Sequence, residues 1–479
     1  MKINLLEVKR ANFTKQKTKI SQKITWTTQQ HTPLPYSPEA KSTLLQVFFL
    51  NTMFSTLTKH IPRATRVVSR RTISTMEEIK NFDPFNPTEE HQALRDMVRQ
   101  FAVNEVDPQR LVHDREEKFN HELFKKCGEL GLLGVTTSTD YGGSGMDATA
   151  ANIVHEELSQ ADPSFCLSYL AHSMLFVNNL NQNGTHEQKM RLLPDMCSGA
   201  KIGGMGMSEP AYGTDVLGLQ TTAVKQSNGD YLLNGQKMWI TNSYLTNPET
   251  GKNELGDAYL VYARTGGPGA KGLSLFLVEK GMEGFSFGQA IKDKSGMRAS
   301  NTGELVFEDV MIPKNNLVGE ENGATVCMMK NLEIERVVLG AMATGIARRS
   351  IDVMGKYSSE RKAFGSPIAE FGQIQKYVAD SYAKYMAGRS YLYNVSNSMD
   401  LDKPGNRLDT DGVKLFTTTM GKEVADNAIQ VLGGYGYCGE YQVEQLWRDA
   451  KLLEIGGGTL ESHQKNMSRD LRKGLPDSK

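Results

Sequence analysis

The stretch Asn228-Gly229-Asp230-Tyr231-Leu232-Leu233-Asn234-Gly235 places two Asn-Gly pairs around a short β-rich run. Asn-Gly pairs favour tight hairpin turns because both residues tolerate positive φ. Further runs rich in aliphatic and aromatic residues follow at 258–263, 273–278 and 303–307, and such runs are typical of strands. Together they predict an antiparallel sheet over residues 204–313.

Helical patterns flank this region on both sides. Thr88 is an N-cap candidate before a run of good helix formers, and residues 148–159 show apolar helical periodicity. Long helical patterns return after Gly323 and break at Pro367, at Pro404 and at the glycines 433–434 and 456–458. Helices, then strands, then helices are not a βαβ alternation, so a doubly wound parallel sheet is disfavoured.

Bulk composition excludes several classes of protein. The 479 residues are enough for two or three domains, and 55 basic residues balance 55 acidic ones, so no electrostatic footprint for nucleic acid is present. Five scattered cysteines form no C-x-x-C pair, which favours a reducing compartment without a disulfide framework or a zinc site. The apolar run 44–50 is too short to span a bilayer, so no transmembrane segment is expected.

Residues 1–76 differ from the rest in composition. They are rich in hydroxyl and basic side chains, and between Met53 and Glu77 no acidic residue occurs. This is typical of a mitochondrial transit peptide and predicts a matrix location; a basic disordered tail is the alternative. Whether translation starts at Met1 or Met53 stays open. The basic residues of the second half are Lys59, Arg63, Arg66, Arg70 and Arg71.

Glu335 is the candidate catalytic residue. It lies in a helical pattern, 330–339, in which residues three and four positions away are neighbours. An apolar environment raises the pKa of a carboxyl group and suits it to proton abstraction. Glu333, by contrast, has Lys330 and Arg336 as helical neighbours. The alternative is that Glu335 reaches water at the edge of an amphipathic face. The apolar neighbours of Glu335 are Leu332, Val338, Leu339 and Met342.

Four further motifs each have a purely structural and a functional interpretation. Gly434-Tyr-Gly436-Tyr-Cys-Gly439 matches a dinucleotide fingerprint but follows a helical pattern, so it is interpreted as a helix end. The loop from Met207 to Asp215 either lines a cofactor or makes an ordinary turn. Trp239, at a strand end, is either a cofactor wall or core. Residues 456–458 are three glycines: they either present backbone free of side chains to a ligand or form a flexible turn.

In this order and spacing, the motifs resemble the acyl-CoA dehydrogenase family over roughly residues 87–471. Within the family, the stretches Leu167-Ser-Tyr-Leu-Ala-His-Ser173 and Gly296-Met-Arg-Ala-Ser-Asn-Thr302 are most similar to those of isovaleryl-CoA dehydrogenases. The motifs are Met207-Ser-Glu-Pro, Gly213-Thr-Asp215, Trp239-Ile-Thr241, Glu335-Arg336, Arg361-Lys-Ala-Phe-Gly365, Gln430-Val-Leu-Gly-Gly434, Arg448-Asp449-Ala450 and Gly458-Thr459.

The resemblance implies an α+β multidomain fold. Residues 80–203 would form an N-terminal helical domain, 204–313 a middle antiparallel β-barrel-like domain, and 314–479 a C-terminal four-helix bundle. It also implies FAD, a homotetramer and electron transfer to electron-transferring flavoprotein. The implied reaction is α,β-dehydrogenation of a short branched acyl-CoA, from isovaleryl-CoA to 3-methylcrotonyl-CoA in leucine catabolism.

The resemblance also assigns roles to residues. Most family members carry their base where this chain has Gly457, whereas the isovaleryl and long-chain enzymes place it on the helix that here carries Glu335. Gly457 would leave room for a branched acyl chain, and no metal is expected. The implied FAD contacts are Met205, Met207, Ser208, Gly213, Thr214, Trp239, Ile240, Thr241, Arg361, Gln430, Val431, Leu432, Gly433, Gly434, Thr459, Leu460 and Glu461. The implied substrate contacts are Thr214, Glu333, Ile334, Arg336, Gly457 and Gly458.

The chain departs from the family pattern at a few positions. Gly372 displaces a glutamine to Gln373, Val326 replaces a tyrosine that faces substrate in isovaleryl enzymes, Leu460 replaces a serine, and residues 243–257 look like an insertion. Three alternatives therefore stay open: a dehydrogenase for another branched or long-chain acyl-CoA, a flavin-binding structural or assembly protein with reduced catalysis, and an oxygen-using oxidase, which the leader disfavours.

Overall fold

The computed structural model describes residues 83–247, 249–403 and 405–475, so the predicted leader lies outside it. The first group of elements is helical, as predicted. The Thr88 side chain accepts a hydrogen bond from the His91 N–H and caps α3, and run 148–159 falls within α6, which Asp147 caps. The helices are α3 (Glu89–Phe101), α4 (Arg110–Glu116), α5 (His121–Glu129), α6 (Ala148–Ala161), α7 (Pro163–Leu170), α8 (Asn179–Asn183) and α9 (His186–Ser198).

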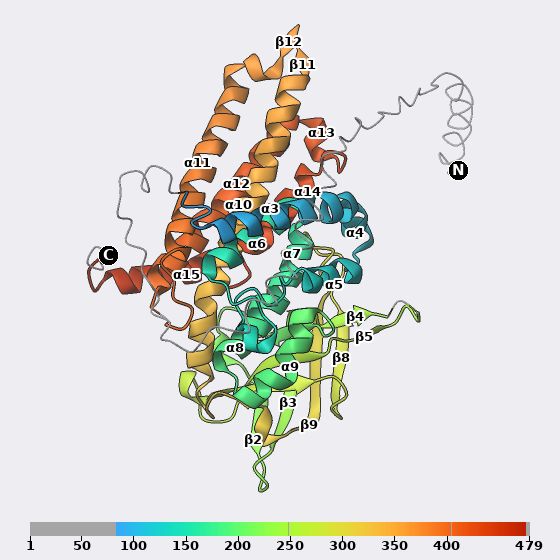
Figure 1. Cartoon of the computed structure of the whole chain (residues 1–479), viewed down its shortest axis with the longest axis vertical. Helices are drawn as coiled ribbons and strands as arrows, with labels where there is room; N and C mark the ends of the chain where they lie inside the picture. The colour runs from blue at the N-terminus through green and yellow to red at the C-terminus, as the bar shows by residue number, and fades with distance from the viewer. Residues whose placement is uncertain (1–82, 248, 404, 476–479) are drawn as a thin grey trace, which may run out of the picture. The chain divides into compact units, whose positions relative to one another are not determined.

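A sheet follows, with the strand order β10-β7-β6-β2-β3-β9-β8 and with β1 paired to β6. Figure 1 labels β2, β3, β8 and β9 in the lower part of the view. The predicted strand runs are confirmed as β6, β7 and part of β9. The strands are β1 (Gly203–Gly206), β2 (Thr222–Lys225), β3 (Tyr231–Thr241), β6 (Ala258–Arg264), β7 (Leu273–Glu279), β8 (Phe285–Ala290), β9 (Thr302–Ile312) and β10 (Leu317–Val318).

The two Asn-Gly pairs do different things. Asn228-Gly229 lies in the turn of the β2–β3 hairpin, as predicted. Asn234-Gly235 is not a turn, which makes that part of the prediction wrong: it lies inside β3 at a shift of register against β9. The reason is steric, since a Cβ on Gly235 would stand within 2.9 Å of Thr221. Gly235 therefore permits close approach of backbone at a bulge.

The sheet is mixed rather than wholly antiparallel. β1 enters from α9, not from a hairpin, and pairs in parallel with β6, as β2 also does at Thr222 and Arg264. Alternate residues of β6 and β7 are buried in two different clusters, which explains why both strands are apolar throughout. One cluster packs against the helices, and the other is enclosed by β3, β6, β7, β8 and β9. The sheet thus curls around its own core in a barrel-like way.

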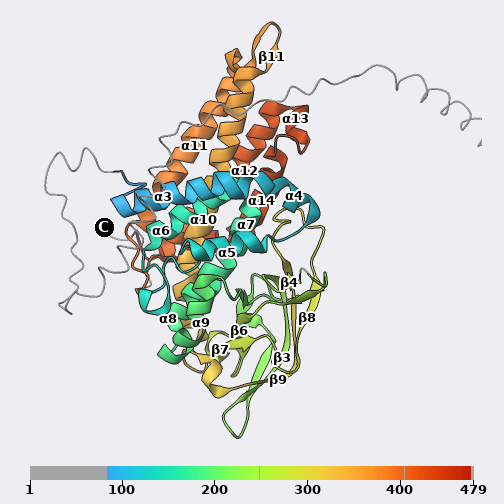
Figure 2. The ribbon, with the colours of Figure 1, turned by 45° about the vertical axis from the view of Figure 1, so that its right-hand side comes forward.

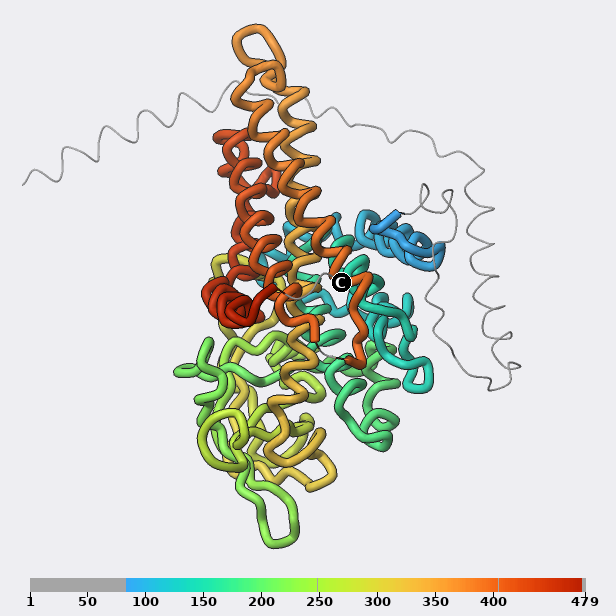
Figure 3. Tube along the Cα trace, turned by 90° about the vertical axis from the view of Figure 1, so that its left-hand side faces the viewer, coloured from blue at the N-terminus to red at the C-terminus, as the bar shows by residue number. Residues whose placement is uncertain are grey.

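The C-terminal region is a bundle of four helices, as predicted, in which α10, α11 and α12 run side by side (Figure 3). α12 ends where the glycine pattern predicted, because Gly433 has a φ of +60° that suits glycine. The bundle helices are α10 (Ala324–Glu360), α11 (Gly372–Ser396), α12 (Arg407–Leu432) and α14 (Val443–Leu453), accompanied by α13 (Gly434–Tyr437), α15 (Leu460–Leu471), β11 (Lys362–Ala363) and β12 (Ser366–Pro367).

A buried ion network joins the first helical group to the bundle. α3 runs across the bundle helices rather than along them (Figure 2). Its Arg95 donates to Glu156 at 2.8 Å and to Tyr393 at 2.6 Å, and Arg389 donates to Glu156 at 2.7 Å. Removing one partner of such a buried pair costs about 3–5 kcal/mol because the other charge stays desolvated. The network therefore ties α3, α6 and α11 together.

Other sequence expectations fall in this part of the chain. The predicted insertion, 243–257, contains a small hairpin of β4 (Tyr244–Thr246) and β5 (Asn253–Leu255). The five cysteines are free thiols, and only Cys438 is exposed. Within the described ranges, none of the helices combines the length and the apolar character that a membrane span needs.

Candidate active site

Glu335 lies about a third of the way along α10 and is buried, with 6% of its surface exposed. Burial raises the pKa of its carboxyl group to about 7, while the positive charges of Arg336 and Lys414 limit the rise. Its Oε2 atom has no hydrogen-bond partner among the described residues. The interpretation that Glu335 reaches water is therefore wrong, and the predicted apolar surroundings are confirmed by the burial of Val338 and Leu339.

Gly457 faces the same point as Glu335. A Cβ built on Gly457 would stand 3.1 Å from Glu335 Oε1 and would overlap Leu339 Cδ1. Gly457 also has a φ of +64°, which disfavours other residues. The predicted convergence of the two positions is thus present. The room that Gly457 was expected to leave for an acyl chain is instead occupied by Leu339.

A charged group that sequence reasoning missed surrounds this point. Lys414, on α12, is fully buried, and its Nζ donates to the Gly458 carbonyl oxygen at 2.5 Å. His463 Nε2 lies 3.1 Å from the same oxygen, and His463 Nδ1 lies 2.6 Å from Asp411 Oδ1. In the sequence, Asp411 and Lys414 read as part of a polar helix face, so only their burial would have singled them out.

The two charged neighbours of Glu335 have partners other than those predicted. Arg336 Nε lies 3.1 Å from Asp411 Oδ1. The Glu333 carboxylate accepts from the backbone N–H groups of Gly405 and Asn406 at 3.0 to 3.1 Å, instead of pairing with Lys330 or Arg336. The predicted pairing of Glu333 with these cations is wrong because the residues just before α12, Gly405 and the N-cap Asn406, lie opposite it and supply backbone N–H donors.

The predicted flavin loop, 207–215, contains a tight turn in which the backbones of Glu209 and Tyr212 bond to each other. Its Glu209 is buried and bonds to Lys237 Nζ at 2.8 Å and to the backbone N–H groups of Gln220 and Thr221. The loop also joins β3 directly, since the Met238 N–H donates to the Ser208 carbonyl at 2.9 Å. Beyond these anchors, Gly213 and Thr214 are exposed.

Trp239 is the largest exposed ring beside this loop. Its side chain is 53% exposed and its φ is +61°, a strained value for a bulky residue. The strain arises at a second bulge, between Lys237 and Ile240. Ile240 is buried, whereas Thr241 stays half-buried. The interpretation of Trp239 as core is therefore wrong, and a flat apolar face lies open next to backbone polar groups.

The flavin loop and the base helix share one apolar cluster. Met205 and Met207 pack against the cluster that holds the start of α10, and Leu332 joins it from α10. Tyr262, on the strand next to β1, is close enough to Glu335 for their charges to interact. The structure thus brings the predicted loop to the helix that carries the carboxylate.

Two other predicted FAD segments lie far from Glu335. Arg361 follows Glu335 by 26 residues at the end of α10, which corresponds to about 39 Å along a helix. At that end, the rings of Tyr357 and Tyr435 lie 6.2 Å apart in a tilted arrangement, so the segment Gln430–Gly434 is close to it. The side chains of Val431 and Leu432 are buried in the bundle core and can offer only backbone.

The remaining predicted residues lie around the start of α15. The Thr459 side chain caps α15 by accepting from the Ser462 N–H, Leu460 is half-buried and Glu461 is exposed. The displaced Gln373 is exposed at the start of α11. Val326 is 61% exposed in the first turn of α10, about 14 Å along the helix from Glu335.

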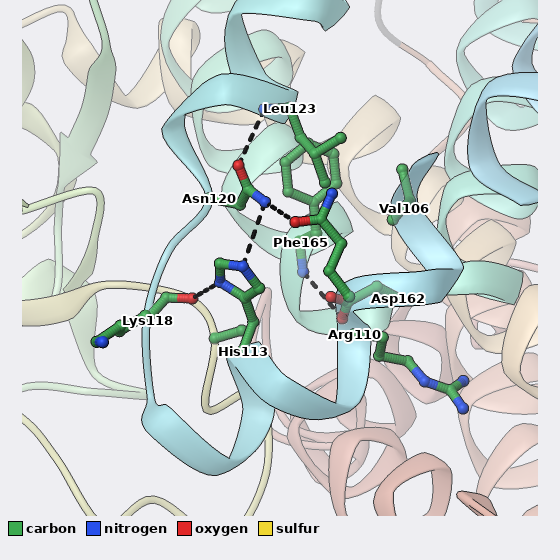
Figure 4. Close-up of a pocket in the computed structure, with 10 residues that line it drawn as sticks. Val106, Arg110, His113, Lys118, Asn120, Leu123, Asp162 and Phe165 are labelled. Carbon is green, nitrogen blue, oxygen red and sulfur yellow. Dashed lines mark hydrogen bonds between the residues drawn. The ribbon is translucent and has the colours of Figure 1, made fainter. Parts of the chain in front are cut away.

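Glu335 does not line either of two cavities in the described part of the chain. One, of about 10 Å³, lies between α4, α5 and α7 (Figure 4) and has room for roughly one water molecule. Asn120 uses its side chain there to cap α5 and to bond to Gln109. A groove of about 460 Å³ runs beside the flavin loop, between Tyr212, Gln236 and Phe307.

Sequence profiles of three domains match the chain in order. The N-terminal domain of acyl-CoA dehydrogenases matches residues 88–200, the middle domain 204–310 and the C-terminal domain 321–471. The chain belongs to the acyl-CoA dehydrogenase family. As a member of it, the chain is an FAD-dependent oxidoreductase.

Individual acyl-CoA dehydrogenases are similar over most of their length. The mitochondrial isovaleryl-CoA dehydrogenase of Solanum tuberosum is 40% identical over 383 residues, covering 79% of this chain and 90% of the relative. The structure of butyryl-CoA dehydrogenase from Megasphaera elsdenii has a TM-score of 0.75 at 32% identity, with 80% and 98% covered. That of a Bacillus anthracis acyl-CoA dehydrogenase complexed with FAD has a TM-score of 0.73 at 30% identity, with 82% and 69% covered.

The residues present fit a flavin. The exposed face of Trp239 offers a wall for a planar ring. A Cβ on Gly213 would meet no atom within 4 Å, so the loop backbone is open to a ligand. Glu335 lies further along the helix whose start joins the shared apolar cluster, and one of its carboxylate oxygens lacks a partner among the described residues.

Proposed function

We propose that this acyl-CoA dehydrogenase removes the α-proton of a short branched acyl-CoA with Glu335 and thereby converts isovaleryl-CoA to 3-methylcrotonyl-CoA. The observation that carries the proposal is the buried Glu335 carboxyl group beside the bare backbone of Gly457. A base works best when its pKa lies near the operating pH, and a pKa of about 7 meets that condition.

The residues divide the work as follows. Glu335 takes the proton from the α-carbon, and its apolar surroundings favour the neutral acid that results. The backbone N–H of Gly457 would donate to the thioester carbonyl as negative charge develops there. FAD, when bound, supplies the acceptor for the hydride that leaves the β-carbon. Trp239 and the flavin loop would hold the ring, and Thr214 would contact both ligands.

Two observations support isovaleryl-CoA as substrate. Glu335 and Gly457 form the pairing that the resemblance implies for isovaleryl and long-chain enzymes, and the relative from Solanum tuberosum carries the isovaleryl name. On this basis the enzyme takes part in leucine breakdown in the mitochondrial matrix and passes its electrons to electron-transferring flavoprotein.

The proposed assembly is a homotetramer. Arg361 and the Gln430–Gly434 segment lie too far from Glu335 to meet the same flavin within one chain. They would instead contact the FAD of a neighbouring copy. The exposure of large aromatic rings at this end, 98% for Phe364 and 86% for Tyr437, is consistent with a surface that another copy covers.

The test is a substrate comparison on purified holoenzyme. Initial rates with an artificial electron acceptor are measured for isovaleryl-CoA, butyryl-CoA and palmitoyl-CoA. The proposal expects the highest kcat/KM for isovaleryl-CoA. A clear preference for either of the other two would overturn the substrate, and flavin-loaded protein without turnover on any of them would favour the structural or assembly alternative.

A further inference from the structure

Lys414 is a buried lysine without an assigned role. It projects from the first third of α12 and has no exposed surface, although lysine is seldom buried without a partner. Its Nζ donates to the Gly458 carbonyl oxygen. Its Cε lies 3.6 Å from the point where a Cβ on Gly457 would stand, the same point that Glu335 Oε1 approaches at 3.1 Å. Lys414 is therefore within a few ångströms of both Gly457 and Glu335.

The bond to Gly458 fixes a turn whose backbone conformation suits only glycine. Gly457 and Gly458 both have positive φ, +64° and +100°. Lys414 Nζ and His463 Nε2 contact the same Gly458 oxygen, from α12 and α15. These two contacts hold the Gly458–Thr459 peptide, one residue after Gly457, and so they restrain where the Gly457 backbone stands relative to Glu335.

The charges around Glu335 are few and come from several elements. Arg336 is on α10 itself and is paired with Asp411 of α12, which also bonds to His463 of α15. Glu454, at the end of α14, is paired with Lys451, and Tyr262 of the sheet is neutral in this environment because burial raises its pKa. Lys414 is the buried cation of this group that lacks a carboxylate within ion-pair distance in the described residues.

We infer that Lys414 is a positioning residue for the proposed dehydrogenation: it holds the Gly457–Gly458 turn against Glu335 and supplies the positive charge that keeps the buried Glu335 carboxylate available as a base. The inference rests on the proposed function of Glu335. It concerns a different residue, one that neither the motifs nor the family resemblance singled out.

Removing the charge should shift a proton equilibrium rather than merely slow the enzyme. Without Lys414, Glu335 would face burial with only the already paired Arg336 to offset it, so its acid form would be favoured. Burial lowers the pKa of Lys414 to about 8, while Glu335 raises it. Lys414 therefore still carries its charge at neutral pH.

The experiment compares Lys414→Met and Lys414→Arg with the wild type, all as flavin-loaded protein. For Lys414→Met we expect the rising limb of the pH profile of kcat/KM to shift to higher pH by about one pH unit or more. Activity should recover at high pH. Lys414→Arg, which keeps the charge, should return the limb toward its original position. A loss of activity that is equal at every pH would overturn the inference.

A second readout does not depend on turnover. The infrared band of a buried protonated carboxyl group is followed in each holoenzyme as pH rises, with Glu335→Gln as the spectrum to subtract. The band should persist to higher pH in Lys414→Met than in the wild type, and an unchanged midpoint would contradict the inference. If Glu335→Gln kept normal turnover, the proposed function would fail instead, so the two failures are distinguishable.

Discussion

Glu335 Oε1 lies 3.1 Å from the point that a Cβ on Gly457 would occupy, although the two residues are 122 positions apart and on different elements. A carboxylate can therefore reach this point either from α10 or from the turn before α15. The chain uses the helix and leaves the turn without a side chain. Several outcomes can be expected from this arrangement.

Glu335→Gln should keep FAD and bind substrate but lose about 10²- to 10⁴-fold in kcat, because an amide cannot accept the α-proton. Stopped-flow reduction of the flavin by isovaleryl-CoA measures this step directly. The matched control is Glu333→Gln, whose amide oxygen can still accept from Gly405 and Asn406. The control should retain most of the rate, and equal losses in both variants would count against the assignment of Glu335.

Moving the carboxylate to position 457 should restore only part of the activity. In Glu335→Gly with Gly457→Glu, the new side chain meets Leu339 and must adopt a φ of +64°, which costs about 1–2 kcal/mol. Adding Leu339→Ala removes the overlap and should raise kcat by about tenfold over the double variant, within the range of general-base effects. If Leu339→Ala gave no gain, overlap with Leu339 would not be the obstacle.

The raised pKa of Glu335 predicts two pH dependences. The rate should rise as pH passes through about 7, because Glu335 must lose its proton to act. Stability has the opposite sign: the unfolded chain releases this proton near pH 4.5 and the folded chain only near 7, so stability falls over that interval. The loss is about 3 kcal/mol and levels off above it.

Urea unfolding of the wild type and of Glu335→Gln at pH 4.5 and at pH 8 measures the stability effect. The variant should gain relative to the wild type at the higher pH. A constant difference between the two proteins would show that Glu335 titrates normally. Asp449, whose pKa burial raises to about 8, contributes to both proteins alike and cancels in the comparison.

The Glu209–Lys237 pair should control flavin retention. Glu209→Gln leaves the buried Lys237 without its carboxylate, a change that costs about 3–5 kcal/mol at buried pairs. Because Glu209 also bonds to Gln220 and Thr221, the flavin loop should loosen, and the purified protein should hold less FAD per chain. Adding Lys237→Met to the Glu209→Gln variant removes the unpaired charge, so it should restore more of the stability than of the FAD content. Full recovery of both would contradict a role for Glu209 in the loop.

Sharing of the flavin site between copies can be tested by mixing. Arg361→Ala and Glu335→Gln are each expected to have low activity, but coexpressed and purified together they should exceed both parents. In a mixed assembly, one copy can supply Glu335 and another Arg361 to the same site. Lys362→Ala, one residue away and also exposed, should keep its activity alone. Activity no greater than the average of the two parents would oppose a shared site.

The sequence predicted the order of elements well, because periodicity and glycine positions are local properties. Thr88, run 148–159 and the end of α12 at Gly433 were all found in this way. Asn234-Gly235 led to a wrong prediction of a turn, because the same dipeptide also suits a bulge when Thr221 packs against the glycine. A dipeptide alone does not distinguish the two.

The site was predictable only in part. The apolar neighbours of Glu335 all belong to the same helix as Glu335, so the burial of Glu335 could be expected from the sequence. Lys414, Asp411 and His463 become buried because α12 and α15 close over α10, and that contact is not encoded in any local pattern. For the same reason, the partners of Glu333 and the space taken by Leu339 could be found only in three dimensions.

The ion network at Arg95 has a consequence for the order of folding. During synthesis, Glu156 emerges 233 residues before Arg389, so an early helical intermediate contains Arg95 and Glu156 without Arg389 and Tyr393. Such an intermediate cannot dehydrate α6 fully until α11 arrives, because a buried carboxylate needs its complete set of donors. We therefore expect the first helices to consolidate late, together with the bundle.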